Sequence, residues 1–231
     1  MSSDFDEMLR QIQQFPANLL DDTAHLLAEM YSADALMGTE NSVPITIDKI
    51  TRTSMVQGAV LNQIMRQQGV THSLEIGFAY GFSTVWMLDA IRDRQGGKHI
   101  SVDPFERRDW GGVGLFQANR LVNNGEFEWI EDFSIHAIPS LIRTGSLFDF
   151  VYIDGNHRFD DVIVDFYLVD QILRPGSLVA LDDLWMPSIQ AALRFVMKNR
   201  AYEWIQQPIE NMAVLQKRDN DDRPWNHFHA F

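Results

Sequence analysis

The chain has 231 residues, of which 45% are apolar, and its formal net charge is −13 at pH 7. That length fits one α/β domain with a modest appendage, and the apolar content is enough for a sizeable core. The acidic balance argues against nucleic acid and against an anionic membrane surface as partners, because both need a basic footprint. The absence of cysteine excludes disulfides, thiolate nucleophiles and cysteine-ligated zinc sites.

The sequence offers no run of apolar residues as long as a membrane span. Its acidic start also lacks the apolar core of a signal peptide. We therefore expect a cytoplasmic protein. The negative charge suits a metal cation or a cationic ligand, although a solvated acidic surface would give the same composition.

The first 36 residues carry apolar side chains at helical spacing, which predicts two helices, the second starting near Pro16. The composition of residues 37–50 favours a loop. Thr53 is a candidate N-terminal cap for a third helix, which we expect to end near Gly69.

From residue 72 onward, strand patterns and helix patterns alternate, which predicts a doubly wound α/β sheet with helices on both faces. The predicted strands are residues 72–77, 99–103, 126–131, 148–154 and 177–183. The first predicted helix begins at the turn after the first strand and ends at Gly96-Gly97. The next two cover residues 115–123 and 135–142. The fourth begins at residue 158 and ends at Pro175-Gly176, and the fifth covers residues 187–199. Two last strands, 202–207 and 211–217, predict an antiparallel hairpin.

A glycine-punctuated turn follows the first of these strands, in LEIGFAYGFST at residues 74–84. Gly77 and Gly81 let the backbone turn sharply and approach a ligand closely. The next strand ends in Asp103, whose carboxylate can accept hydrogen bonds from both hydroxyls of a ribose. This outline is typical of a nucleotide-binding crevice, although the strict GxGxxG pattern is absent.

Glu75 lies inside the strand, two residues before the turn. An acid at this place would repel a pyrophosphate, whereas it suits a ligand with a positive centre and an amino-acid tail. The alternative is a plain helix-start turn with a satisfied buried acid.

Three acids follow the fourth and fifth strands: Asp154, Asp182 and Asp183. Because neighbouring parallel strands lie about 4.8 Å apart, these carboxylates can converge on one point. They would repel one another there unless a cation neutralised them, and Mg²⁺ prefers such oxygen ligands. His157 is a candidate general base, or a nitrogen ligand that favours Mn²⁺ or Zn²⁺. The alternative is that these acids cap the helices that follow.

These segments resemble class I S-adenosylmethionine-dependent methyltransferases. The turn LEIGFAYGFST is similar to the first motif of the family, and FDFVYIDGNHRFDDVIVDF with LRPGSLVALDD is similar to its strand-four to strand-five block. The chain looks most like the small metal-dependent O-methyltransferases of the catechol and caffeoyl-CoA types and their bacterial relatives, over about residues 53–217. The resemblance implies a Rossmann-like sheet of seven strands in residues 53–231, with residues 1–52 as a helical extension.

The resemblance also implies a role for each matched residue. The methionine part of S-adenosylmethionine would contact Glu75, Gly77, Gly81 and Ser83. Its ribose would contact Asp103, and its adenine would contact Asp132, Phe133 and Ser134. Asp154 would also lie beside the cofactor. A divalent cation such as Mg²⁺ would bind Asp154, Asp182 and Asp183. His157 lies where catechol-type enzymes place a lysine base, and Asp183 lies where many relatives have asparagine.

We therefore expect a metal-dependent O-methyltransferase, a homodimer or higher homo-oligomer, that methylates a hydroxyl of a small molecule. Asp154 and His157 would be its catalytic residues, with His157 accepting the hydroxyl proton. A vicinal diol, catechol or sugar would offer the metal two oxygens. The alternatives are an NAD-dependent oxidoreductase or epimerase, a methyltransferase-fold protein that binds without turnover, and a metal-dependent hydrolase.

Overall fold

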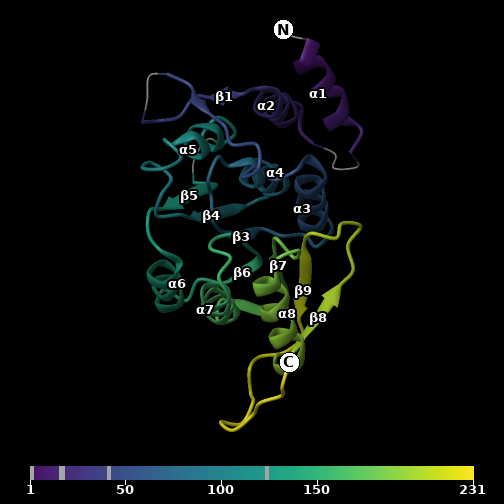
Figure 1. The fold of residues 1–231 in the computed structure, drawn as a ribbon, viewed down its shortest axis with the longest axis vertical. Coiled ribbons are helices and arrows are strands. Elements are labelled where there is room, and N and C mark those ends of the chain that lie inside the picture. The colour runs from purple at the N-terminus through teal and green to yellow at the C-terminus, as the bar shows by residue number, and fades with distance from the viewer. Residues whose placement is uncertain (1–2, 16–18, 41–42, 123–124) are drawn as a thin grey trace. The chain divides into compact units, whose positions relative to one another are not determined.

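The computed structural model describes residues 3–15, 19–40, 43–122 and 125–231 (Figure 1). The chain forms two compact units, which are taken in turn. One unit consists of Met1–Thr71 with Phe78–Glu131, and the other of His72–Gly77 with Asp132–Phe231. Within the described ranges, no helix combines the length and the apolar character needed to cross a membrane.

The first unit is mainly helical. Its helices are α1 (Ser3–Gln13), α2 (Asp21–Ser32), α3 (Met55–Gln67), α4 (Phe82–Ile91) and α5 (Val113–Ala118). Its strands are β1 (Ala35–Leu36), β2 (Ile45–Thr46), β4 (Lys98–Val102) and β5 (Phe127–Ile130). The pair β1 and β2 is antiparallel and the pair β4 and β5 is parallel.

The core of the first unit joins the N-terminal helices to α4. Trp86 on α4 is fully buried, and its indole Nε1 donates a hydrogen bond to the Tyr31 hydroxyl at 3.2 Å. That hydroxyl donates in turn to the carbonyl oxygen of Thr53 at 2.7 Å. Gly58 faces the same indole ring, because a Cβ at this position would lie 2.2 Å from the ring. The predicted boundary between a helical extension of residues 1–52 and a methyltransferase domain of residues 53–231 stays a prediction.

Several local predictions for this unit were wrong. The short strands β1 and β2 fall in segments predicted as helix and loop. Ser54, not Thr53, caps α3, since its hydroxyl accepts from the Gln57 N–H at 3.2 Å. Pro16 lies outside the described residues, and α2 begins at Asp21. Helix α4 ends at Ile91 and α5 ends at Ala118, both earlier than expected.

The second unit contains the centre and the C-terminal end of the sheet. Its strands are β3 (His72–Ile76), β6 (Phe148–Ile153), β7 (Leu173–Leu181), β8 (Tyr202–Ile205) and β9 (Ala213–Lys217). Its helices are α6 (Ser134–Arg143), α7 (Phe159–Asp170) and α8 (Pro187–Asn199). Strand β6 is parallel to both β3 and β7, while β9 is antiparallel to both β7 and β8.

Across the described residues, the main sheet has seven strands in the order β5-β4-β3-β6-β7-β9-β8. This confirms the predicted α/β fold with a mostly parallel sheet and an antiparallel hairpin at its C-terminal end. The carboxyl ends of parallel strands in such a sheet form the usual place for a ligand.

Strand β7 begins earlier than predicted. Pro175 and Gly176, expected to end the preceding helix, lie within β7. Phe148 pairs with Leu173 and Phe150 pairs with Leu178, so the extra residues of β7 form an irregularity between these two pairs. Proline has no N–H to donate to a neighbouring strand, and irregularities of this kind accommodate it.

The C-terminal tail packs against helices of its own unit. The Phe231 ring lies 5.3 Å from the Phe195 ring and 6.4 Å from the Phe159 ring, measured between centroids. The His229 N–H donates to the side-chain oxygen of Asn199 at 2.8 Å.

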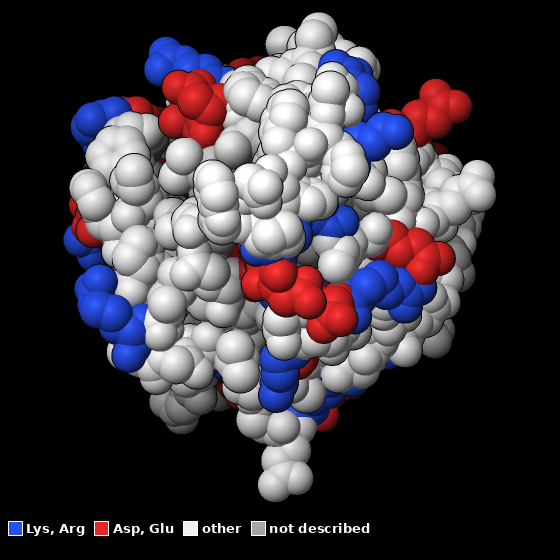
Figure 2. Space-filling view, turned by 90° about the horizontal axis from the view of Figure 1, so that it is seen from below, with Lys and Arg blue, Asp and Glu red and all other residues white. Residues whose placement is uncertain are grey.

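Figure 2 shows a face on which acidic and basic side chains lie beside one another in small groups.

Candidate metal centre and cofactor turn

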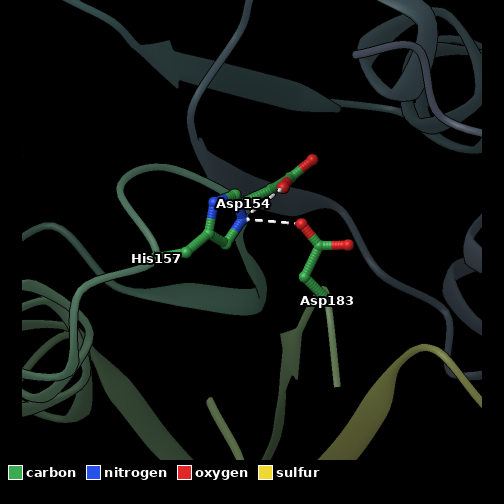
Figure 3. Close-up of side chains that lie close together, drawn as sticks. All are labelled: Asp154, His157 and Asp183. Carbon is green, nitrogen blue, oxygen red and sulfur yellow. Dashed lines mark ion pairs between the residues drawn. The ribbon is translucent and has the colours of Figure 1, made fainter. Parts of the chain in front are cut away.

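Two carboxylates and one imidazole of the second unit lie close together. Asp154 follows β6 and Asp183 comes two residues after β7, and the ends of these strands are adjacent because Ile153 pairs with Leu181. The Nε2 atom of His157 lies 3.0 Å from Asp183 Oδ2 and 3.5 Å from Asp154 Oδ1 (Figure 3). One ligand atom from each of the three residues lies within 4.8 Å of the other two.

The Nε2 atom of His157 is buried between the two carboxylates. No described group gives it a hydrogen bond of acceptable geometry. The loop that carries it is held by Ser188, whose hydroxyl donates to the His157 carbonyl oxygen at 2.6 Å. The nitrogen is therefore fixed in position and aimed at the acids, without a partner that fully satisfies it.

The charges of this cluster are poorly balanced. Burial raises the pKa of Asp154 well above its ordinary value, and the charge of Asp182 raises it further, while His157 acts in the opposite direction. The pKa of His157 is raised, mainly by Asp154, with added contributions from Asp183 and Asp182 against the effect of burial. A group of buried acids that favours protons in this way also favours a cation.

Asp182 lies beside the cluster, with its oxygens engaged by other groups. Its Oδ2 accepts from the Tyr152 hydroxyl at 2.6 Å, and its Oδ1 accepts from the Asp183 N–H at 2.7 Å. The Asn211 amide approaches the same Oδ1 at 3.4 Å. Burial raises the pKa of Tyr152 well above its usual value, so this hydroxyl remains a donor. Asp182 is thus placed to orient the loop after β7.

Asp183 adopts a backbone conformation that is rare outside glycine. Its φ is +53°, in the left-handed region. The Trp185 indole donates to Asp183 Oδ1 at 2.9 Å, and the Asn211 amide lies 3.3 Å from the same oxygen. Strained backbone of this kind concentrates at functional sites, where surrounding contacts hold it in place.

Helix capping does not account for these acids. The N-cap residues of α7 and α8 are Arg158 and Met186, and neither helix has a side-chain cap among the described residues. The capping alternative is therefore wrong for Asp154, Asp182 and Asp183.

The end of β3 belongs to the same unit as the acid cluster. Gly77 has a φ of +92°, and a Cβ on it would lie 2.1 Å from the carbonyl oxygen of Asp154. Glu75 is fully buried in β3, where it pairs in register with Tyr152. Only glycine fits at position 77, so the turn begins against the backbone that carries Asp154.

The rest of the glycine turn belongs to the first unit, together with Asp103. One oxygen of Asp103 accepts from the N–H groups of Phe78, at 2.9 Å, and Ala79, at 3.2 Å. The other accepts from the Phe105 N–H at 2.7 Å. Ala79 and Gly81 both have positive φ values, +45° and +75°. Asp103 therefore fixes the turn, and Ser83 follows it, buried in the first turn of α4.

The residues expected beside adenine surround the start of α6 in the second unit. Ser134 donates from its hydroxyl to Asp165 at 2.5 Å, and burial raises the pKa of Asp165 to about 6. Asp132 Oδ1 accepts from the Phe133 N–H at 2.8 Å and lies 2.9 Å from His136 Nδ1. The Phe133 ring is half exposed and can offer an apolar face.

Sequence reasoning missed four side chains that matter here. Tyr152 and Asn211 hold Asp182, Asp165 holds Ser134, and Ser188 holds the His157 loop. Tyr152 lies within an apolar strand pattern and Asn211 in a hairpin loop, so neither carries a signal of its own. The nearly continuous burial of β6 does not show that a tyrosine hydroxyl there reaches the end of β7.

Comparison with known proteins gives a family match. Residues 74–184 match a family model described as a methyltransferase domain. This segment contains the glycine turn, Asp103 and the acid cluster. No curated protein matches the chain.

Solved structures give a likeness over nearly the whole chain. Cofactor-bound Rv0187 from MTB is 16% identical, with a TM-score of 0.70, and the match covers 95% of this chain and 100% of that one. The O-methyltransferase TomG from Streptomyces achromogenes, in complex with SAM, is 17% identical, with a TM-score of 0.65 and coverages of 94% and 100%. The O-methyltransferase from Bacillus cereus, in complex with SAH, is 17% identical, with a TM-score of 0.63 and coverages of 92% and 100%.

At these identities the solved structures show the fold, and the family match points to a methyltransferase domain in residues 74–184. Neither supports the NAD-dependent oxidoreductase considered from the sequence. Residues 74–184 thus match a methyltransferase domain, within a fold that the chain shares with these solved structures.

Proposed function

We propose that this methyltransferase transfers the methyl group of S-adenosylmethionine to a hydroxyl group of a small molecule held by a divalent cation. The observation that carries the proposal is the buried Nε2 of His157, which lies between Asp154 and Asp183 and lacks a hydrogen-bond partner among the described groups. Two similar folds, TomG and the Bacillus cereus protein, are named O-methyltransferases, which supports oxygen as the acceptor atom.

The donor atoms fit a divalent cation. Asp154, Asp183 and His157 present two carboxylate oxygens and one nitrogen within 4.8 Å of one another. A nitrogen among oxygen ligands suits Mn²⁺ or Zn²⁺ better than Mg²⁺, which prefers oxygen alone. In our proposal Asp182 supports this set through its hydrogen bond to the Asp183 N–H. An Mg²⁺ site would instead use the carboxylates of all three aspartates.

His157 cannot be a ligand and a general base through the same Nε2 at the same time. We favour the ligand role, because this nitrogen faces two carboxylates. A base must reach the hydroxyl whose proton it takes. The Ser188 hydroxyl, bonded to the His157 carbonyl, would restrain the loop in either role.

The chemistry requires a deprotonated acceptor oxygen in line with the methyl–sulfur bond. A cation at this centre would lower the pKa of the acceptor hydroxyl and restrict its direction. The protein side of the site is rigid, since Trp185 and Asn211 fix one oxygen of Asp183. Well-oriented reactions can gain about 7–11 kcal/mol over unpositioned ones. A vicinal diol, catechol or sugar, with two neighbouring oxygens, is the acceptor class we propose.

Methyl transfer from labelled S-adenosylmethionine to a panel of catechols, diols and sugars tests this proposal. Each acceptor is assayed with Mn²⁺, with Mg²⁺, with Zn²⁺ and with EDTA. We expect turnover with a cation, and a loss of about 100-fold or more in EDTA and in Asp183→Ala. Asp160→Asn removes an exposed acid at the start of α7 and should match the wild type. Equal turnover with cation and with EDTA would refute the metal role.

The role of His157 is tested by His157→Gln. If His157 is a ligand, its loss lowers Mn²⁺ affinity measured by calorimetry, by about 10-fold or more. If it is the base, Mn²⁺ affinity stays unchanged while kcat falls and the acidic limb of its pH profile disappears. Unchanged affinity in this variant would therefore move His157 from the ligand set to the base.

We further propose that the chain acts as a homodimer or higher homo-oligomer, without nucleic-acid or membrane partners. Several large aromatic side chains are exposed, among them Trp185 and Trp225, which a second copy would cover. Light scattering of the purified protein at micromolar concentration gives the molar mass. A monomeric mass would overturn this part of the proposal.

A further inference from the structure

The first unit buries an acid that the proposed reaction does not use. Glu106, in the loop after β4, is fully buried. Its Oε1 accepts from the Leu115 N–H at 2.8 Å, and its backbone carbonyl accepts from the Gly112 N–H at 2.8 Å. Its Oε2 has no hydrogen-bond partner among the described residues. Burying a charged carboxylate with one oxygen that has no hydrogen bond costs far more free energy than burying the protonated carboxyl.

The surroundings of Glu106 raise the pKa of its carboxyl group. Burial is the main cause that raises the pKa of Glu106 to about 8, and the charges of Asp103 and Glu40 raise it further, while hydrogen bonds from the Leu115 and Gly114 backbone lower it. Arg107 does not offset these charges, because its guanidinium pairs with Glu40 at 3.3 Å and with Glu131 at 3.3 Å. Burial and the neighbouring acids therefore favour the protonated form of Glu106.

The backbone that Glu106 holds packs tightly on the glycine turn. A Cβ on Gly114 would lie 2.7 Å from the carbonyl oxygen of Ala79. A Cβ on Gly81 would lie 2.8 Å from the Gly114 Cα. No space separates the start of α5 from the turn, so a shift of one displaces the other.

The same loop is joined to the segment before β2. The Gly112 carbonyl accepts from the Thr39 N–H at 3.1 Å, and the Gly111 carbonyl accepts from the Glu40 N–H at 3.3 Å. Asp103 holds the other side of the turn through its own hydrogen bonds. Glu106 thus bonds to the same backbone segment that contacts both the glycine turn and residues 39–40.

We infer that Glu106 is a positioning residue for the cofactor: its neutral carboxyl holds the start of α5 against the glycine turn, and its ionisation beside Asp103 weakens S-adenosylmethionine binding. This inference rests on the proposed cofactor role of the turn and of Asp103. Glu106 touches no reacting group in this account and acts only through the backbone of residues 112–115.

The direction of the pH effect follows from linkage. If the bound state requires the protonated carboxyl, the free enzyme must take up a proton to bind once Glu106 has ionised. Affinity is then level below the pKa and falls above it, by about tenfold for each pH unit. The ligand's own α-amino group titrates in the same range, so variants must be compared at equal pH.

Calorimetric titration with S-adenosylmethionine at pH 7 and pH 9 tests the inference on wild type and Glu106→Gln. The amide keeps the shape and stays neutral. We expect the wild type to lose about tenfold more affinity than Glu106→Gln between the two pH values. Equal losses in the two proteins would overturn the inference. Thermal unfolding at both pH values shows that each protein is folded.

Glu40→Gln is a second variant that keeps the test decisive if Glu106→Gln does not fold. Removing the charge of Glu40 lowers the pKa of Glu106, so the alkaline loss should begin at a lower pH than in the wild type. An onset that does not move, or that moves to higher pH, would contradict the inference. Failure of the wild type to bind the cofactor at pH 7 would instead refute the cofactor assignment, and the role of Glu106 with it.

Discussion

The carbonyl oxygen of Asp154 lies where a side chain on Gly77 would have to be. A Cβ on Gly77 would approach this oxygen to 2.1 Å, and the Gly77 φ is +92°. The end of β3 and the first residue after β6 are therefore in direct backbone contact. This contact links the first glycine of the turn to the proposed metal centre.

Gly77→Ala should therefore destabilise the protein by several kcal/mol and abolish activity. Gly176→Ala is the matched control, because Gly176 has a φ of +95° but no described atom within 4 Å of an added Cβ. The control carries only the cost of left-handed backbone, about 1–2 kcal/mol. Urea unfolding of both variants measures the difference. Equal losses would show that the contact with Asp154 does not constrain position 77.

Asp103→Asn should weaken cofactor binding and loosen the glycine turn. Asp103 accepts three backbone hydrogen bonds, from Phe78, Ala79 and Phe105, and an amide has only one oxygen to offer. We expect a destabilisation of about 1–3 kcal/mol, since a backbone N–H loses its acceptor. Chemical denaturation and calorimetry with S-adenosylmethionine measure both effects.

Asp109→Asn serves as its control, because Asp109 is exposed and pairs only with the exposed Arg108 in the described structure. A surface pair of this kind contributes about 0–1 kcal/mol. Wild-type cofactor affinity in Asp103→Asn would contradict the assigned role of the acid.

Asp165 should make the stability of the protein depend on pH in mildly acidic solution. Burial raises its pKa to about 6, from an ordinary value of 3.8. The stability linked to its neutral form is fully present below the ordinary value, and it is lost as the pH rises through about 6. Relative to Asp165→Asn, the wild type should lose up to about 3 kcal/mol between pH 4 and pH 6.5.

Urea unfolding of the wild type and Asp165→Asn at several pH values measures this difference. Other carboxyl groups titrate in both proteins, so only the difference reports on Asp165. A difference that stays constant, or that changes in the other direction, would rule out a raised pKa at Asp165.

Phe231→Ala should detach the C-terminal tail from α7 and α8. The ring packs edge-on against Phe195 and stacks near Phe159, although 46% of the residue is exposed. We expect a loss of about 1 kcal/mol in unfolding free energy and faster proteolysis of the tail. Trp225→Ala is the control, since Trp225 is 97% exposed and should leave stability unchanged. Equal effects of the two substitutions would contradict the packing of Phe231.

Much of the fold follows from simple patterns in the sequence. Helix α8 has the bounds that its apolar spacing predicts, residues 187–199. The strands on which the site depends, β3, β6 and the end of β7, also fall where buried apolar runs and the acids after them place them. Such signals are strong because both faces of a central strand are covered.

The errors have identifiable physical causes. Pro175 reads as the end of a helix, but the irregular pairing of β7 accepts it in a strand. The strands β1 and β2 have two residues each, too few to show a period. Thr53 and Ser54 have similar capping chemistry. In the structure the Ser54 hydroxyl accepts from the Gln57 N–H, and the Thr53 carbonyl oxygen accepts from the Tyr31 hydroxyl.

The candidate site was less predictable than the fold. The sequence places Asp154, Asp183 and His157 near the ends of neighbouring strands, but it does not show that Ser188 donates to the His157 carbonyl oxygen. Glu106 gives no signal, because the segment DPFERRDW reads as an exposed polar loop. Its burial depends on contacts with distant parts of the chain, which no local pattern encodes.

A sequential calorimetric titration tests whether the protein binds both S-adenosylmethionine and a divalent cation. The protein is titrated first with S-adenosylmethionine and then, as that complex, with Mn²⁺. We expect saturable binding of both in the wild type, and loss of the Mn²⁺ signal alone in Asp183→Ala. A wild type that binds no S-adenosylmethionine, or Mn²⁺ binding that is identical in Asp183→Ala, would contradict the proposed function.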